Sequence, residues 1–422
     1  MKALILAAGT SSRLKPITDK NLLNFCGETL LEKRINSLKQ LNFEEIIIST
    51  NKENKKEIEK ITKKYQKIKI IIQKDLSQGQ AGGVLAAESE IQNNPVLITS
   101  VNDVIENEVQ VFKKIIKKEN IDGVILGLKV KEYFPGGYIE LKGNKITRII
   151  EKPGEGNTPS DYINIVVHFF KKPAELLTDL KKYLHKKEGG YEDALSELTQ
   201  KQNIEIFKYQ DYWQAIKFPW HILDLNHFFL SQIKKNQISP RSQIHPTALV
   251  ENSIISDGVK LEAYSIVKNS FVGKNSFVGN FSLVRNSNIG EKCVVGSSTE
   301  ITRSFFASQV WTHENYIGDS VIDKNVSFGA KTTTANLRLD EGEIRVDIKG
   351  KKVPTNKNKI GIFCGPHVRV GVGVVFNPGI KINENSFINS HLKIEKEVKK
   401  NTFTKNKTEI VKNLNLGIRS RI

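Results

Sequence analysis

A basic, hydroxyl-rich loop follows the first apolar run of the sequence. The run ends in Ala8-Gly9, and the loop beyond it carries Arg13 and then Lys20. A strand that ends in small residues lets the backbone approach a ligand, and consecutive N–H groups at a strand-to-helix turn bind phosphate oxygens. Arg13 adds a permanent positive charge and Lys20 adds a second. The pattern predicts a phosphate or nucleotide site, although the same residues also suit a structural turn.

The elements that must position this loop form an alternating pattern up to about residue 230. Strand-like runs that are apolar throughout and separated by helical stretches predict a parallel sheet covered on both faces. This is an α/β, Rossmann-like arrangement of the nucleotide-binding kind. The strand-like runs are ALILA, EEIIIST, IKIIIQ, PVLITS, DGVILGLKV and INIVVHFF, and the helical stretches include LLEKRINSLKQL, KKEIEKITKKYQ and QAGGVLAAESEI. The polar stretch 231–243 then marks a linker.

A six-residue apolar repeat dominates the chain beyond the linker. Ile255, Leu261 and Val267 stand six apart, and equivalent positions recur every 17 residues at Val272 and Ile289. Three such steps to a coil fit a triangular prism in which each side is one short strand. The alternative, a β-sandwich, has less regular strand spacing. The triplets are Val272, Val278, Val284; Ile289, Val295, Ile301; Ile322, Phe328, Thr334; and, with a fourth member, Cys364, Val370, Phe376, Ile382.

Composition narrows the classes of function. The 422 residues predict two domains, and 39% hydrophobic content suffices for two cores. The formal charge of +18 comes from scattered lysines, so we expect small phosphorylated ligands and no nucleic-acid partner. Three distant cysteines predict no disulfide and a reducing cytoplasm. No apolar stretch predicts a membrane span or a signal peptide.

The N-terminal half resembles the sugar-1-phosphate nucleotidylyltransferases. The family signature is met by LAAGTSSRLKPIT and KNLL, followed in the family's order by QKDLSQGQAGGVLAA, PVLITSVNDVI, GGYIEL, IIEKPGEG, YINIVVHFF and WQAIKFPWHILDLN. The resemblance implies attack of a sugar phosphate oxygen on the α-phosphorus of a nucleoside triphosphate, UTP or dTTP, with loss of pyrophosphate and with Mg²⁺ as the cofactor. It implies these roles: Arg13, Lys20 and Asp103 catalytic, with Asp103 as metal ligand; Leu6, Ala7, Ala8, Gly9, Gln73, Gly79, Gln80 and Ala81 for the nucleotide; Gly137, Glu151, Lys152 and Asn164 for the sugar phosphate.

The N-terminal half departs from the family at two places. The loop before Lys20 is about three residues short, and Asp19 replaces its proline. Ala215 stands where the second metal carboxylate is expected, and neither Asp211 nor Asp224 is shown by the sequence to replace it.

The C-terminal half resembles the left-handed parallel β-helix of acyltransferases. Its run HENYIGDSVIDKNVSFGAKTTTAN is similar to one in the bifunctional N-acetylglucosamine-1-phosphate uridylyltransferase and glucosamine-1-phosphate acetyltransferase family, and the whole resemblance, most like archaeal-type members, extends to about residue 410. It implies that His313 is the general base that takes a proton from a sugar amine while acetyl-CoA donates the acetyl group. It implies further site residues: Tyr316 and Asn336 to orient the sugar amine and thioester, Arg285 for the sugar phosphate, and backbone near Gly329 and Ala330 for the acyl carrier.

The C-terminal half also departs from its family. Thr302 replaces a lysine of the family, although Arg303 follows it, and Ser327 replaces an asparagine. Lys331 replaces a glycine. Gly342 replaces a second lysine, although Arg345 supplies a positive charge three residues later. The insertion 337–359 breaks the six-residue rhythm and should project from the prism, where it could cover a neighbouring subunit's site.

Together these patterns predict a Rossmann-like nucleotidyltransferase (GT-A-like) domain at 1–230, a linker at 231–243, a left-handed β-helix of hexapeptide repeats at 244–410 and a tail at 411–422. The expected product is UDP-N-acetylglucosamine, with N-acetylation of glucosamine 1-phosphate at the second domain, in a cytoplasmic homotrimer. Two alternatives stay open. One is transfer to another sugar, as in glucose-1-phosphate thymidylyl- or uridylyltransferases, with a non-acetylating β-helix. The other is a non-catalytic paralogue that binds sugar nucleotides.

Overall fold

The computed structural model describes residues 1–186, 189–405 and 409–412. The chain forms two compact units, within each of which the residues contact one another closely. Unit 1 comprises Met1–Thr10 and Leu30–Ala215, and unit 2 comprises Ser11–Thr29 and the chain from Ile216 onward. The loop segment with Arg13 and Lys20 therefore groups with the C-terminal half. Of the predicted tail at 411–422, only residues 411 and 412 are described, and the rest of this prediction lies outside the described residues.

Unit 1 contains a nine-stranded sheet in the order β5-β4-β1-β6-β11-β8-β12-β10-β9. Its strands are β1 Lys2–Leu6, β4 Glu45–Thr50, β5 Ile68–Ile72, β6 Val96–Ser100, β8 Gly123–Lys129, β9 Gly137–Lys142, β10 Lys145–Glu151, β11 Tyr162–Phe170 and β12 Ile204–Tyr209. β7 Asp103–Ile105 and β13 Trp213–Ala215 form a separate pair. The helices are α1 Leu30–Lys39, α2 Lys55–Thr62, α3 Gly79–Leu85, α4 Glu88–Ile91, α5 Glu108–Ile116, α6 Ala174–Tyr183 and α7 Gly190–Lys201, with a 3-10 turn η2 Leu76–Gln78.

The expectation of a wholly parallel sheet is wrong for part of unit 1. β1 pairs in parallel with β4 and β6, as predicted, but β11 runs antiparallel to both β6 and β8. β9 and β10 are also antiparallel to each other. A parallel connection needs a crossover of a dozen or more residues, usually through a helix, and no helix lies between β8 and β11. β8 and β11 are instead joined through the β9–β10 hairpin, so no helical crossover returns the chain to the parallel direction.

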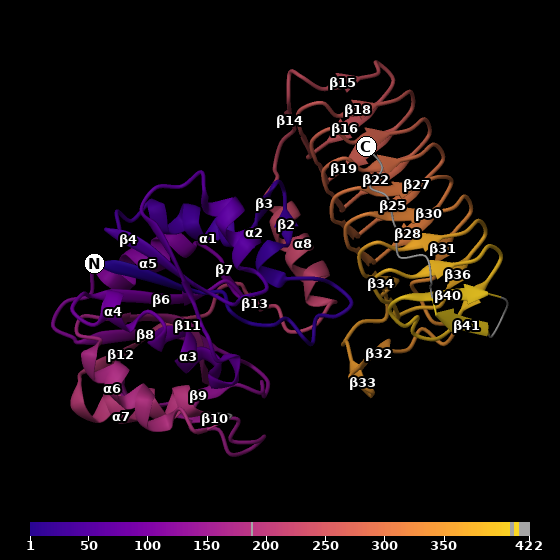
Figure 1. The fold of residues 1–422 in the computed structure, drawn as a ribbon. Helices are drawn as coiled ribbons and strands as arrows, with labels where there is room; N and C mark the ends of the chain where they lie inside the picture. Colours follow the sequence, from indigo (N-terminus) through magenta and orange to yellow (C-terminus); the bar gives the residue numbers. More distant parts are fainter. Residues whose placement is uncertain (187–188, 406–408, 413–422) are drawn as a thin grey trace. The chain divides into compact units, whose positions relative to one another are not determined.

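Unit 2 is built mainly from three parallel sheets of short strands, which form the faces of the predicted left-handed β-helix (Figure 1). The first face contains β14 Gln237–Ile238, β17 Ile254–Ile255, β20 Phe271–Val272, β23 Asn288–Ile289, β26 Phe305–Phe306, β29 Val321–Ile322, β34 Ile362–Cys364 and β37 Ile380–Ile382. The second contains β15 Gln243–Ile244, β18 Lys260–Leu261, β21 Phe277–Val278, β24 Val294–Val295, β27 Val310–Thr312, β30 Val326–Phe328, β35 Arg369–Val370, β38 Phe387–Ile388, β40 Thr402–Lys405 and, antiparallel to β40, β41 Glu409–Lys412. The third contains β16 Leu249–Glu251, β19 Ile266–Lys268, β22 Leu283–Arg285, β25 Glu300–Thr302, β28 Tyr316–Gly318, β31 Thr333–Thr334, β36 Val375–Phe376 and β39 Lys393–Ile394.

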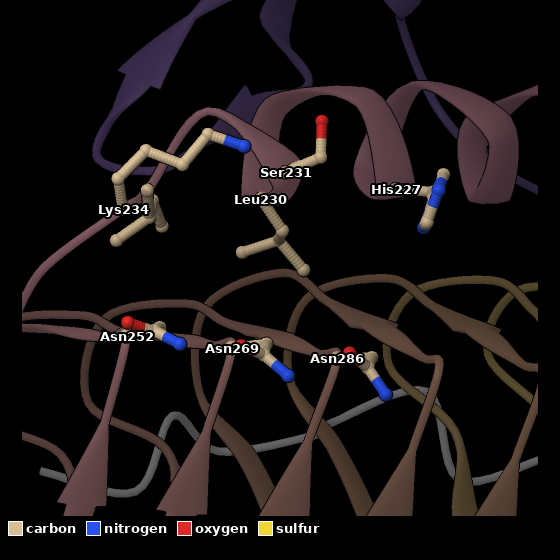
Figure 2. Close-up of a pocket in the computed structure, with 8 residues that line it drawn as sticks. His227, Leu230, Ser231, Lys234, Asn252, Asn269 and Asn286 are labelled. Carbon is tan, nitrogen blue, oxygen red and sulfur yellow. The ribbon is translucent and has the colours of Figure 1, made fainter.

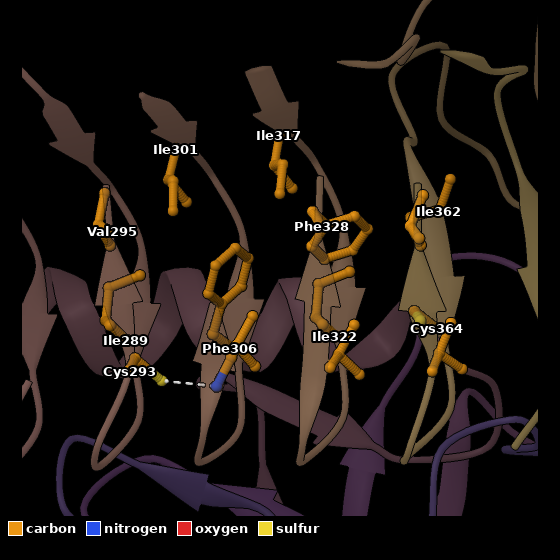
Figure 3. Packing of buried hydrophobic residues seen from close by; sticks show 14 of the residues in the cluster. Ile289, Cys293, Val295, Ile301, Phe306, Ile317, Ile322, Phe328, Ile362 and Cys364 are labelled. Atoms are coloured by element: carbon orange, nitrogen blue, oxygen red, sulfur yellow. Dashed lines mark hydrogen bonds between the residues drawn. The ribbon is translucent and has the colours of Figure 1, made fainter. Parts of the chain in front are cut away.

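The repeated aliphatic residues stack in register inside this prism. Ile255 pairs with Val272, Val272 with Ile289, and Ile289 with Phe306, which are the positions that the 17-residue spacing made equivalent. All four side chains are buried in one core, and Figure 3 shows two of them, Ile289 and Phe306. Because each coil repeats the same inward positions, burial of one aliphatic ladder per face holds successive coils together. Cys293 also lies in this core and accepts a hydrogen bond from the Val310 N–H at 3.4 Å.

The insertion forms a hairpin of β32 Arg345–Ile348 and β33 Lys351–Pro354 between β31 and β34. The side-chain amine of Lys349, at the hairpin tip, donates to Ser12 Oγ at 3.3 Å. The hairpin therefore reaches the loop that carries Arg13 in the same chain.

The segment Ser11–Thr29 and helix α8 (His221–Ser231) both lie on the first face of the β-helix. The segment contains a 3-10 turn η1 Lys20–Leu22 and a small hairpin, β2 Asn24–Phe25 and β3 Glu28–Thr29. The Phe25 ring lies 5.0 Å from Phe305 of β26 and 5.1 Å from Phe229 of α8, measured between centroids. Burial of these three aromatic rings fixes the segment against the coils.

Candidate functional site

The turn after β1 presents backbone N–H groups at the end of a buried strand. The carbonyl of Ala7 accepts from Asn54 Nδ2 at 2.9 Å, and the carbonyl of Ala8 accepts from Asn51 Nδ2 at 2.8 Å. The N–H groups of Ala8 and Gly9 donate to no group among the described residues. Two buried asparagines thus hold the carbonyls on one side and leave the amides for a ligand. The sequence analysis missed both asparagines.

Arg13 lies in unit 2 with an exposed side chain. Within the described residues its guanidinium has no acidic partner, and its one contact of note is the Phe218 ring, 5.9 Å from the guanidinium carbon to the ring centroid. A guanidinium stays charged at all relevant pH values and binds phosphate through paired N–H groups. Arg13 is therefore a charge that no internal carboxylate neutralises.

Lys20 begins the 3-10 turn η1, and Asp19 caps it. The Asp19 carboxylate accepts from the N–H of Asn21 at 2.9 Å, and the N–H of Lys20 donates to Ser11 Oγ at 3.4 Å. A carboxylate at this position satisfies amides that a turn start leaves unpaired. The replacement of the family's proline by Asp19 therefore has a structural explanation.

Buried polar groups of the β-helix hold this segment in place. Asp323, which is almost fully buried, accepts from the N–H of Thr18 at 2.9 Å. Burial raises the pKa of the Asp323 carboxyl, and the hydrogen bonds from Lys324 and Thr18 oppose that rise. Asn288, with no exposed surface, accepts from the N–H of Cys26 at 2.9 Å. The cation-bearing loop is thus anchored at two points to coils more than 260 residues away in sequence.

Asp103 starts β7 and lies directly opposite Ala215 of β13. Its carboxylate accepts from Trp213 Nε1 at 3.1 Å, and its carbonyl accepts from Arg34 Nη2 at 2.6 Å. Arg34 is almost fully buried, also donates to Thr99 and forms an ion pair with Glu108. Burial raises the pKa of Glu108, and the Arg34 charge opposes the rise. Arg34 and Glu108 therefore support the predicted metal ligand, and the sequence analysis missed both.

The residues around Asp103 can hold Mg²⁺ through few protein ligands. Within the described residues no three His, Cys, Asp or Glu side chains gather as a metal-binding group. The Oδ1 of Asn102 is buried there without a hydrogen-bond partner. A carboxylate and an amide oxygen are suitable Mg²⁺ ligands, and substrate phosphates commonly complete the shell. The Asp224 carboxylate already has a cationic partner, because it is paired with Lys357 at 2.6 Å.

Gln73 is buried at the end of β5 and has a fixed amide orientation. Its Nε2 donates to the carbonyls of Asp75 and Gly79, both at 2.9 Å. Both partners can only accept, so Oε1 is the group left for a ligand. A Cβ on Gly82 would lie 2.6 Å from Gln73 Nε2, so the glycine is needed for this close approach. Gln80 is exposed and Ala81 is buried at the start of α3.

The predicted sugar-binding residues converge on the β9–β10 hairpin and β11. Gly137 and Glu151 are register partners, and Lys152 follows with a φ of 46°. A Cβ on Gly137 would lie 3.2 Å from Cγ of Glu192, a residue of α7 that the sequence analysis missed. The pKa of Glu192 is raised to about 7. Burial is the largest cause, and the negative charge of the nearby Glu151 is the next largest.

The predicted acetyltransferase residues lie on the third face of the β-helix and at its corner. Tyr316 Oη accepts from Asn336 Nδ2 at 3.2 Å, so the structure brings these two side chains together. Asn336 Nδ2 also donates to Asp319, which accepts both Arg303 Nε and Nη2. Arg303 therefore has a structural role in this chain.

His313, Arg285 and Ala330 complete the predicted acetyltransferase set. His313 is exposed at the corner after β27, where a Cβ on Gly296 would lie 3.0 Å from its Nδ1. Arg285 is partly exposed and donates to Glu300 at 2.9 Å. The carbonyl of Ala330 accepts from the N–H of Gly373 at 2.9 Å. Within the described residues, His313 makes no hydrogen bond or ion pair with Tyr316 or with Arg285, and Thr302 is fully buried.

A further cavity of about 320 Å³ lies in unit 2 between α8 and one corner of the β-helix (Figure 2). Three asparagines, Asn252, Asn269 and Asn286, line one side with parallel side chains. All three have positive φ, a conformation that asparagine tolerates well, which explains their recurrence at a coil corner. None of the predicted site residues lines this cavity.

Comparisons with known proteins agree with this organisation. Residues 2–227 match the nucleotidyl transferase family, and residues 232–336 match the GMPPB C-terminal domain. A bifunctional sugar-1-phosphate nucleotidylyltransferase/acetyltransferase of Sulfurisphaera tokodaii is 33% identical over 384 residues, which are 88% of this chain and 92% of the relative. A bifunctional protein GlmU of Methanococcus maripaludis is 37% identical over 88% of this chain and 89% of its own length.

A second GlmU protein, of Methanocaldococcus jannaschii, is 28% identical over the same shares of the two chains. None of the helices among the described residues is long and apolar enough to cross a membrane. The matches cover both halves of the chain in one continuous alignment of nearly full length. This chain belongs to the archaeal family of bifunctional sugar-1-phosphate nucleotidylyltransferase/acetyltransferases.

Proposed function

We propose that the chain converts UTP and N-acetylglucosamine 1-phosphate into UDP-N-acetylglucosamine and pyrophosphate. The observation that carries the choice of base is the fixed amide of Gln73, which offers only an acceptor. Uracil and thymine carry a ring N–H on the edge that pairs with such an acceptor, whereas the same ring atom of cytosine is itself an acceptor. Among the pyrimidine bases, one with a ring N–H, in UTP or dTTP, therefore suits Gln73.

The chemistry requires two anions to meet. An oxygen of the sugar phosphate attacks the α-phosphorus, a new P–O bond forms, and the bond from the α-phosphorus to the bridging oxygen of pyrophosphate breaks. Arg13 and Lys20 would neutralise the triphosphate and the leaving group, while the amides of Ala8 and Gly9 would bind phosphate oxygens. Asp103, with Asn102 beside it, would hold Mg²⁺, which when bound supplies further positive charge to the phosphates.

We propose that the β-helix transfers the acetyl group of acetyl-CoA to the amine of glucosamine 1-phosphate. The amine nitrogen attacks the thioester carbonyl, a C–N bond forms, the C–S bond breaks and the thiol of coenzyme A leaves. His313 would accept the amine proton, and the Tyr316–Asn336 pair would orient the reacting groups. The exposed position of His313 supports this role, because its ring nitrogens are accessible to a ligand.

Two assays on the purified chain test these activities separately. Pyrophosphate release with Mg²⁺ should be fastest for UTP with N-acetylglucosamine 1-phosphate among several triphosphates and sugar phosphates. Thiol release from acetyl-CoA should require glucosamine 1-phosphate. Faster turnover of glucose 1-phosphate with dTTP or UTP, without acetyl transfer, would favour the first alternative. Nucleotide-sugar binding without either turnover would favour the non-catalytic alternative, which Ala215 opposite Asp103 supports.

We also propose that three copies assemble through their β-helices. A triangular prism has flat faces that pack well about a threefold axis. Unit 2 exposes large hydrophobic side chains at one corner, where the Tyr264 and Phe281 rings stack at 5.3 Å and are 56% and 66% exposed. Light scattering at micromolar concentration should give three times the chain mass of 47.6 kDa. A monomer mass would contradict the proposal.

A further inference from the structure

A buried histidine lies behind Asn164 and has no part in the reaction described above. His168 is on β11, and its side chain has no exposed surface. Its Nε2 lies 2.8 Å from Asn164 Oδ1, and its Nδ1 lies 2.9 Å from Tyr191 Oη. The Tyr191 ring stacks on the imidazole at 5.7 Å with 17° between the planes. Three side chains from β11 and α7 thus form one hydrogen-bonded chain.

The partners fix where each proton lies. An amide oxygen can only accept, so the proton is on Nε2 of His168. Nδ1 is then an acceptor and receives the Tyr191 hydroxyl proton. Burial lowers the pKa of the His168 imidazole to about 3 and raises the pKa of the Tyr191 phenol, so both groups are neutral near pH 7. A hydrogen bond with the Ile165 backbone opposes the lowering of the His168 pKa. With Asn164 Oδ1 facing Nε2, as in the structure, the three side chains have this arrangement of donors and acceptors.

This arrangement determines what Asn164 can offer a ligand. Its Oδ1 is occupied by His168, whereas its Nδ2 donates to no group among the described residues. A rotated carboxamide would place an N–H against the Nε2–H of His168, so rotation would also require the imidazole proton to move to Nδ1 and the Tyr191 hydroxyl to accept it. In the orientation that the structure shows, Asn164 presents two N–H donors.

We propose that His168 and Tyr191 are positioning residues that hold Asn164 as a donor, so that the sugar-phosphate site selects a ligand with an acceptor oxygen at that point. Such an oxygen is a sugar hydroxyl or the carbonyl of an acetamido group. The inference rests on the proposed function, since it assigns Asn164 to the sugar phosphate. The proposed positioning affects binding of the sugar 1-phosphate and not the transfer step. Its loss should therefore raise KM for the sugar 1-phosphate and not KM for UTP.

Three variants separate positioning from support of the fold. His168→Phe removes both hydrogen bonds, His168→Gln keeps an N–H donor for Asn164, and Tyr191→Phe removes only the outer bond. Loss of a hydrogen bond from a positioned neutral group changes binding by about tenfold. We expect KM for the sugar 1-phosphate to rise about tenfold in His168→Phe, less in Tyr191→Phe, and to recover in His168→Gln. KM for UTP should stay within about threefold. Tyr183→Phe, which removes another tyrosine hydroxyl bond near α7, is the matched control.

Deoxy substrates identify the acceptor oxygen. Among sugar 1-phosphates that each lack one oxygen, one should bind the wild type and His168→Phe equally, because the contact that the variant loses is already absent. Equal rises in both Michaelis constants, or a lower Tm with unchanged KM for the sugar, would overturn the positioning role.

A measurement without turnover separates this inference from the proposed function. Imidazole ¹⁵N NMR of the full chain should show one neutral histidine with the proton on Nε2 from pH 8 down to pH 5. That signal should move on addition of the sugar 1-phosphate. No response to any sugar 1-phosphate in the wild type would overturn the proposed function itself. Binding that is insensitive to His168→Phe would overturn only the inference.

Discussion

Arg13→Ala should lower kcat/KM for pyrophosphate release by about 10²–10³, the usual cost of removing one charged or donor group aimed at a developing anion. The side chain is exposed, lies over the Phe218 ring and has no acidic partner among the described residues. Among the described residues its charge is therefore not neutralised by a carboxylate and is available to phosphates. Steady-state assays over UTP and the sugar 1-phosphate measure the loss.

Several comparisons identify the cause of that loss. Arg13→Lys should recover part of the rate, because it keeps the charge but not the planar paired donors. Arg148→Ala removes an exposed arginine on β10 and should leave both activities unchanged. Asp323→Ala should give a smaller loss than Arg13→Ala, because it removes an anchor of the loop and keeps the cation. Acetyl transfer should be normal in Arg13→Ala. A change of less than about threefold in pyrophosphate release would exclude Arg13 from the transfer step.

The repeated core of the β-helix could be predicted because its determinants are local. Each coil places Ile, Val or Leu every six residues, so neighbours in space such as Ile255 and Val272 are related by one fixed spacing in sequence. The parallel half of the sheet in unit 1 follows in the same way from its intervening helices. The antiparallel β11 was not predicted, because an apolar run such as INIVVHFF does not indicate its direction. Direction depends on the connection before it.

The sequence analysis proposed residues that could carry the chemistry directly and missed the residues that hold them in place. Arg34 stands in an amphipathic helical pattern, and its hydrogen bond to the Asp103 carbonyl bridges 69 positions in sequence. Asp323 contacts Thr18 across 305 positions. No periodicity relates such pairs.

His168 did leave a signal in the sequence. A histidine inside an otherwise apolar strand must be satisfied by polar partners when it is buried. That requirement predicts a polar network on β11 but does not identify Asn164 and Tyr191 as its members.

His313→Asn should lower acetyl transfer by about 10²–10⁴, the usual contribution of a positioned general base. The asparagine is close to the imidazole in size but cannot take a proton from the amine. Pyrophosphate release should be unchanged, which makes the first activity an internal check that the chain is folded. Acetyl-CoA consumption with glucosamine 1-phosphate measures the loss, and the nucleophile can be supplied already deprotonated by raising the pH. The deficit should therefore shrink at alkaline pH.

A second histidine in the β-helix provides the control. His391 lies at a coil corner, where a Cβ on Gly373 would lie 2.8 Å from its Nδ1, much as a Cβ on Gly296 would lie 3.0 Å from Nδ1 of His313. His391→Asn repeats the same chemical change in a similar local setting and should leave acetyl transfer intact. The two variants together distinguish loss of a base from disturbance of a corner, because only a base role predicts a large rate loss at one position and none at the other. Normal acetylation by His313→Asn would remove this histidine from the mechanism and leave the Tyr316–Asn336 pair without an assigned base.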